Sequence, residues 1–69
     1  MKKKVIVYGL NTSPKTNILK YKLTEGGYEI ELIDSADKIA EKGITTIPIV
    51  EYEGRLLTYI EAVGILLGK

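Results

Sequence analysis

The sequence predicts a single α/β domain with the element order β-α-β-α-β-β-α, in which helices flank a four-stranded mixed sheet. Two observations lead to this prediction. Short runs rich in β-branched residues alternate with helical segments, and the last two predicted strands are separated only by Glu53 and Gly54. The chain has 69 residues, 45% of them hydrophobic, and shows no repeat or linker. We therefore expect residues 1–69 to form one domain with one core.

The first strand and the first helix are predicted in the first third of the chain. Residues 5–8 are a continuous apolar run, which is typical of a strand in the middle of a sheet. Ser13 is a favoured N-cap residue and Pro14 suits the first helical position, so we expect a helix over residues 14–25. The glycine pair that follows ends this helix. Its expected buried stripe consists of Ile18, Leu19 and Leu23, with Tyr21 at the margin.

A second strand and a short helix follow. In residues 28–33, apolar side chains alternate with Glu29 and Glu31, which indicates an edge strand with one solvent-exposed face. Because a helix separates this strand from the first, the two should be parallel. Ser35 can cap a short helix over residues 36–42 that is anchored by Ile39.

The end of the chain predicts a hairpin and a last helix. Residues 47–52 and 55–57 flank a two-residue turn whose glycine suits a positive φ. Thr58 and Glu61 have the spacing of a capping box, so we expect a helix that begins at Tyr59. The residues of this helix expected to face the sheet are Ala62, Val63, Leu66 and Leu67.

Two loops of the predicted fold carry a recognisable pattern. Ser13-Pro14-Lys15-Thr16 begins the first helix, and Thr46-Ile47-Pro48 leads into the third strand. This layout resembles the thioredoxin superfamily, most closely the short glutaredoxins and NrdH-type redoxins. In those proteins a Cys-Pro-x-Cys loop begins the first helix and a cis-proline loop faces it. The resemblance implies a thioredoxin-like, glutaredoxin-type fold with the strand order 2-1-3-4.

The resemblance also implies a redox site, because Ser13 and Thr16 occupy the positions of the two cysteines in this family of thiol-disulfide oxidoreductases. The chain contains no cysteine. A hydroxyl group cannot form or exchange a disulfide, so we expect no redox catalysis and no catalytic residue. One hypothesis is therefore an engineered, designed or cysteine-stripped redoxin that serves as a stable scaffold. Electron transfer would return only if the cysteines were restored.

The alternative hypothesis is a binding module that keeps the ligand groove of the family beside the proline loop. The resemblance implies an extended peptide, glutathione or a former redoxin partner protein as the ligand. The candidate groove residues are Tyr8, Thr46, Ile47, Pro48, Thr58 and Tyr59.

Composition and charge exclude several other function classes. The net charge of +1 comes from interspersed acids and bases, so the sequence predicts no basic surface patch that could bind nucleic acid or an anionic membrane. Without cysteine and histidine the usual zinc and iron ligands are absent, and we expect no cofactor. We interpret the run Lys2-Lys3-Lys4 as a charged segment before the first strand that aids solubility and is not a binding patch. The apolar stretches are too short for a bilayer span and no signal peptide is recognisable, so we expect a cytoplasmic protein. We also expect a monomer, because the core of a 69-residue chain consumes most of the apolar residues that could form a dimer interface.

Overall fold

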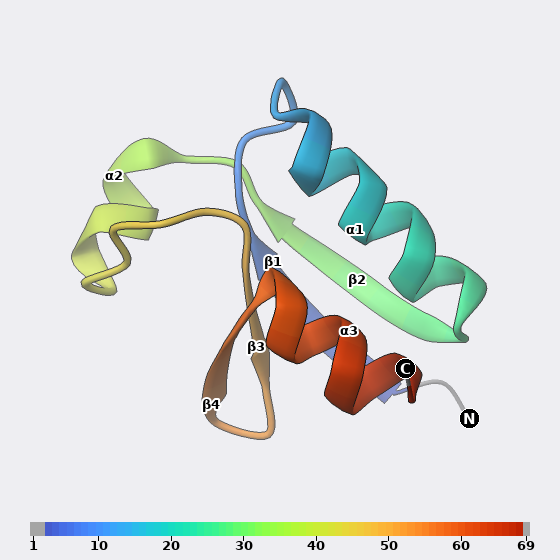
Figure 1. The fold of residues 1–69 in the computed structure, drawn as a ribbon. Coiled ribbons are helices and arrows are strands. Elements are labelled where there is room, and N and C mark those ends of the chain that lie inside the picture. Colours follow the sequence, from blue (N-terminus) through green and yellow to red (C-terminus); the bar gives the residue numbers. More distant parts are fainter. Residues whose placement is uncertain (1–2, 69) are drawn as a thin grey trace.

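The computed structural model describes residues 3–68, which form a four-stranded mixed sheet and three helices (Figure 1). The strand order is β2-β1-β3-β4, as predicted. β1 is parallel to β2 and antiparallel to β3, and β3 is antiparallel to β4. This is a thioredoxin-like topology. The strands are β1 (Lys3–Tyr8), β2 (Tyr28–Ile33), β3 (Ile49–Tyr52) and β4 (Arg55–Thr58), and the helices are α1 (Pro14–Glu25), α2 (Ala36–Glu41) and α3 (Tyr59–Leu67).

The two faces of the sheet are covered unequally, because side chains alternate along each strand. Val5 and Val7 of β1 point into a larger core beneath α1 and α3. Tyr8 points to the other face, where it packs with Ile39 of α2 and Ile49 of β3. The short helix α2 lies at one end of the sheet (Figure 1). The larger core contains Val5, Val7, Leu19, Leu23, Val50, Leu57, Ala62 and Leu66.

The buried stripe of α1 differs from the predicted one. Leu19 and Leu23 are buried as expected, but their third partner is Thr16, whereas Ile18 is 47% exposed and Tyr21 is 67% exposed. Each residue advances about 100° around a helix, so the spacing of residues 16, 19 and 23 defines one face and residue 18 lies outside it. The prediction that Ile18 is buried was therefore wrong.

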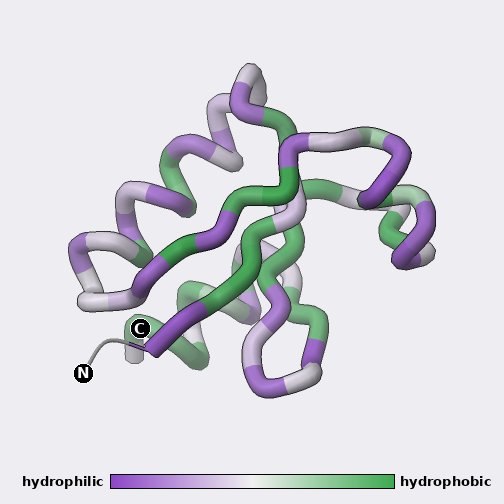
Figure 2. The backbone as a smooth tube through the Cα atoms, turned by 180° about the vertical axis from the view of Figure 1, so that it is seen from behind, coloured by the Kyte–Doolittle hydropathy of each residue, from purple (hydrophilic) through white to green (hydrophobic). Residues whose placement is uncertain are grey.

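The first strand begins earlier than predicted. β1 starts at Lys3, which pairs with Tyr28 at the start of β2, and the strand changes from hydrophilic to hydrophobic along its length (Figure 2). Lys3 Nζ donates a hydrogen bond to the Tyr52 hydroxyl at 3.1 Å, and Lys4 Nζ lies 3.1 Å from Glu31 Oε1. Lys3 and Lys4 thus belong to β1, and their side chains form a hydrogen bond and an ion pair, so they are not a separate segment before the strand. Lys2 lies outside the described residues.

The predicted hairpin is present with small shifts, and the last helix begins at Tyr59, as predicted. β3 begins at Ile49 instead of residue 47, and its turn to β4 places Glu53 and Gly54 at φ 51° and 78°. The predicted capping box of α3 is confirmed: the Thr58 amide donates to Glu61 Oε1 at 3.0 Å, and the Glu61 amide donates to Thr58 Oγ1 at 3.2 Å. Within residues 3–68, no helix is long and apolar enough to cross a membrane.

Candidate functional site

The two loops singled out in the sequence border a common groove. It lies between the first turn of α1, the loop before β3 and the first turn of α3, and it encloses about 340 Å³. The structure therefore brings together five of the six predicted groove residues and adds two. The lining residues are Lys15, Thr46, Ile47, Pro48, Thr58, Tyr59 and Ile60.

The position of the loop before β3 is set by strand pairing. Ile49 pairs with Tyr8 on one side and with Thr58 on the other, so residues 46–48 lie next to the start of α3. Pro48 is buried, and the Ile47-Pro48 peptide bond is cis. Thr46 and Ile47 precede the first residue of β3 and line the groove.

The groove offers unpaired peptide groups together with apolar side chains. Within residues 3–68, no backbone hydrogen bond joins Thr46 or Ile47 to another residue. Ile60 is 80% exposed, and Ile47, which is half-buried, also lines the groove. Lys15 is exposed and adds one ammonium group to the lining. The groove can therefore contact both the main chain and the side chains of an extended ligand.

The two hydroxyl residues of the first loop do not line this groove. Ser13 has the extended backbone of an N-cap residue, with φ −83° and ψ 124°, but its side chain makes no capping hydrogen bond. The Ser13 amide instead donates to the Leu10 carbonyl at 2.9 Å, and the Ser13 carbonyl accepts from the Asn17 amide at 3.1 Å. The start of α1 is thus held by main-chain bonds, and the predicted capping role of the Ser13 side chain is not observed.

Thr16 is fully buried. Its Oγ1 has no hydrogen-bond partner among the described residues, and the side chain packs against Gly9 at the end of β1. Sequence reasoning placed this residue at a former cysteine position but did not foresee its burial.

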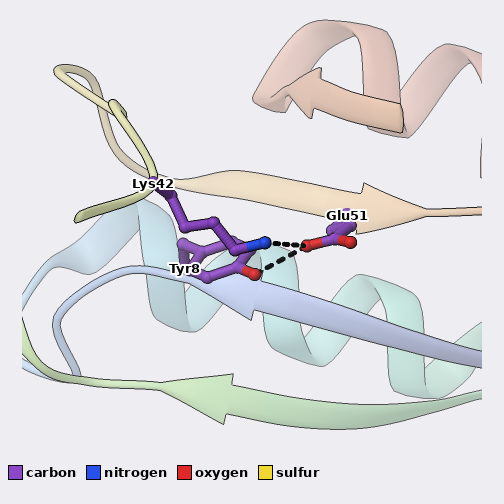
Figure 3. Close-up of polar contacts among 3 residues, drawn as sticks. All are labelled: Tyr8, Lys42 and Glu51. Carbon is purple, nitrogen blue, oxygen red and sulfur yellow. Dashed lines mark hydrogen bonds and ion pairs between the residues drawn. The ribbon is translucent and has the colours of Figure 1, made fainter. Parts of the chain in front are cut away.

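Tyr8 does not line the groove, because it points to the opposite face of the sheet. Val7 and Tyr8 are consecutive strand residues, so their side chains leave the sheet on opposite sides. The Tyr8 hydroxyl donates a hydrogen bond to Glu51 Oε1 at 2.6 Å, and Lys42 Nζ lies 3.6 Å from the same oxygen (Figure 3). Sequence reasoning missed this cluster. The one signal in the sequence is Glu51, a charged residue inside an apolar strand.

The three members of this cluster influence one another's ionisation. The hydrogen bond from Tyr8 holds the pKa of Glu51 below its ordinary value, and the charge of Lys42 acts in the same direction against the effect of burial. Burial raises the pKa of Tyr8, and the neighbouring carboxylate raises it further. The Glu51 charge raises the pKa of Lys42. At neutral pH the cluster therefore consists of the neutral Tyr8 phenol, the ionised Glu51 carboxylate and the Lys42 ammonium group.

Within the described part of the chain, no three acidic, histidine or cysteine side chains gather where a metal ion could bind. Comparison with protein-family models, curated proteins and solved structures finds no match for this chain. The thioredoxin-like fold therefore rests on the topology of the sheet.

Proposed function

We propose that this chain is a redox-inactive, glutaredoxin-like domain that binds an extended peptide in the groove beside Pro48. The supporting observation is the unpaired main chain of Thr46 and Ile47 along that groove. An extended peptide can bind such a segment as an added strand, so that main-chain hydrogen bonds supply affinity and neighbouring pockets select side chains.

The groove favours a ligand with an apolar side chain and a carboxylate. Ile47 and Ile60 supply apolar surface, which is stabilising to bury. Lys15 supplies an ammonium group in the first turn of α1, and the positive dipole ends of α1 and α3 at the groove also favour negative charge. A peptide with a free carboxyl terminus satisfies these requirements, as does glutathione.

The redox-inactive part of the proposal rests on the chemistry of the first loop. Ser13 and Thr16 carry hydroxyl groups, and the chain has neither cysteine nor histidine. Neither hydroxyl can exchange a disulfide, and there is no imidazole to activate Ser13 as a nucleophile. Thr16 is in addition buried, which removes its hydroxyl from any ligand in the groove.

A second candidate, a scaffold with no ligand whose cysteines were replaced, is favoured by the surroundings of Thr16. A buried hydroxyl without a hydrogen-bond partner costs about 1–3 kcal/mol. A thiol behaves as a small hydrophobic group and carries a smaller penalty. The site around Thr16 Oγ1 therefore suits cysteine better than threonine. On this reading the groove is only a remnant of the parent fold.

Peptide binding distinguishes the two candidates. The probe is a fluorescently labelled hexapeptide of alternating valine and serine with a free carboxyl terminus, followed by anisotropy. Ile60→Glu places a charge on the groove wall, and Ile65→Glu is the matched control on the same helix, because Ile65 is 53% exposed and lies outside the lining. We expect saturable binding that Ile60→Glu weakens by about fivefold or more and Ile65→Glu leaves unchanged. No saturable binding, or equal effects of both variants, would favour the scaffold.

A further inference from the structure

A second cavity lies on the opposite face of the sheet from the groove, where α2 meets the ends of β1 and β2. It is open to solvent, has a volume of about 370 Å³ and is lined by Tyr8, Ile33, Lys38, Glu41 and Lys42. Ligand pockets for small molecules begin at about 300 Å³, so this volume can hold a compact organic molecule. Tyr8 and Ile33 from the strands give the cavity apolar surface, and the three charged residues come from α2 and its C-cap.

Two ammonium groups stand on the same side of this cavity. Lys38 and Lys42 are four residues apart along α2 and its cap, so their side chains lie on one helix face. Lys38 forms no ion pair within the described residues. Lys42 lies above the Tyr8 ring, with Nζ 5.9 Å from the ring centroid, and points toward Glu51 (Figure 3).

The Lys42 ammonium keeps the capacity to bind a ligand. Its contact with Glu51 is a single one at 3.6 Å, and the Lys42 side chain is half exposed. An ammonium group has three donors, so it can retain Glu51 and still donate to a second anion. The Tyr8 hydroxyl donates a hydrogen bond to Glu51 Oε1 at 2.6 Å, and this bond orients the carboxylate that faces Lys42.

We propose that this cavity binds a small organic monoanion, with its apolar body against Tyr8 and Ile33 and its carboxylate between Lys38 and Lys42. Glu41 sits on the same rim and is also without an ion pair in the described residues. Its negative charge offsets one of the two ammonium charges, so the three charged lining residues together carry +1 and match a ligand with a single negative charge. The proposal does not depend on the peptide groove, because the two sites share no lining residue.

Phenylacetate is the probe, and phenylacetamide is its neutral counterpart of the same shape. Each is titrated into the ¹⁵N-labelled full chain while backbone amide shifts are recorded. We expect phenylacetate to give saturable shifts at Tyr8, Ile33 and residues 38–42, and phenylacetamide to bind at least about threefold more weakly. The absence of saturable shifts there, or equal binding of the two compounds, would overturn the proposal.

Variants test the roles of the rim charges. Lys38→Gln should weaken phenylacetate binding by about threefold, and Glu41→Gln should strengthen it. Lys22→Gln, an exposed lysine of α1 outside the cavity, is the matched control and should leave the affinity unchanged. Because all three positions are exposed, the fold should be unaffected, and the amide spectrum of each variant shows whether it is. Equal affinity in Lys38→Gln and the wild type would refute the assigned anion position.

Discussion

Thr16 lies so close to Gly9 that no side chain fits at position 9. A Cβ atom on Gly9 would be 2.5 Å from Thr16 Oγ1 and 3.0 Å from Thr16 Cγ2. Both residues are buried, and the Gly9 amide also donates to the Ile33 carbonyl at 3.2 Å. This contact fixes the end of β1 against the first turn of α1, and it therefore sets the position of the loop that carries Ser13.

The Gly9→Ala variant should lose about 2 kcal/mol of unfolding free energy, because the added methyl group overlaps Thr16 and forces the strand and the helix apart. The same substitution in a Thr16→Ala chain should cost much less, since the overlapping atoms are gone. Urea denaturation of the two single variants and the double variant gives the coupling between the positions. Equal costs of Gly9→Ala in both backgrounds would refute the contact.

The Thr16→Val variant should gain about 1 kcal/mol of unfolding free energy, because it keeps the shape of the side chain and removes a buried hydroxyl that has no partner within residues 3–68. Thr24→Val is the matched control on an exposed position of the same helix, and it should change stability by less than about 0.5 kcal/mol. Both are measured by urea denaturation. A clear loss of stability in Thr16→Val would show that the hydroxyl is satisfied in solution.

Local signals in the sequence were sufficient to predict the element order. The capping box of Thr58 and Glu61, the Glu53-Gly54 turn and the alternation of β2 depend on neighbours in the chain, and the structure contains all three. The strand order came from the resemblance of the two loops to the glutaredoxins, because periodicity does not determine which strands are neighbours.

Features that depend on distant contacts were predicted less well. Ile18 was expected in the core, but the helix turns Thr16 toward Gly9 instead, and hydrophobicity alone does not rank a threonine above an isoleucine. Tyr8 was assigned to the groove, whereas its pairing register with Ile49 places it on the face of α2. The contact of Lys42 with Glu51 joins the C-cap of α2 to β3, and no local sequence pattern predicts such a contact between distant residues.

The Tyr8→Phe variant should lose about 1.5–3 kcal/mol of unfolding free energy at neutral pH, the usual range for a hydrogen bond to a charged group. It removes the hydroxyl that donates to Glu51 Oε1 and leaves the ring in place. Tyr21→Phe is the control, because Tyr21 is 67% exposed, and it should have almost no effect. Thermal or urea unfolding measures both, and similar values for the two variants would contradict a stabilising role of the cluster.

The cost of Tyr8→Phe should also depend on pH. The pKa of Glu51 lies below its ordinary value of 4.5 in the folded chain, chiefly through the Tyr8 hydrogen bond. The folded state therefore favours the ionised carboxylate, and this stabilisation is complete above the unfolded-state pKa and disappears as the pH falls through the folded-state pKa. The stability difference between wild type and Tyr8→Phe should be constant near pH 7 and shrink below pH 4.5. A difference that stays constant down to acid unfolding would exclude this linkage.

The Ser13→Cys/Thr16→Cys double variant should gain disulfide reductase activity in a coupled turnover assay, while the wild type should show none above buffer. The N-terminus of α1 favours a thiolate at position 13, and position 16 can supply the second thiol. Thr16→Cys alone is the control and should remain inactive, because that side chain is buried. Activity of the wild type would contradict the proposal that the chain is redox-inactive. A folded double variant without activity would contradict the glutaredoxin-like interpretation.

The most direct test of peptide binding in the groove is an amide NMR titration of the ¹⁵N-labelled chain with the valine-serine hexapeptide, and in parallel with glutathione. We predict saturable shifts at Lys15, at Thr46 and Ile47, and at residues 58–60, with residues 38–42 unchanged. A well-dispersed spectrum in which those amides do not move with either ligand would contradict the proposal that the groove binds an extended peptide.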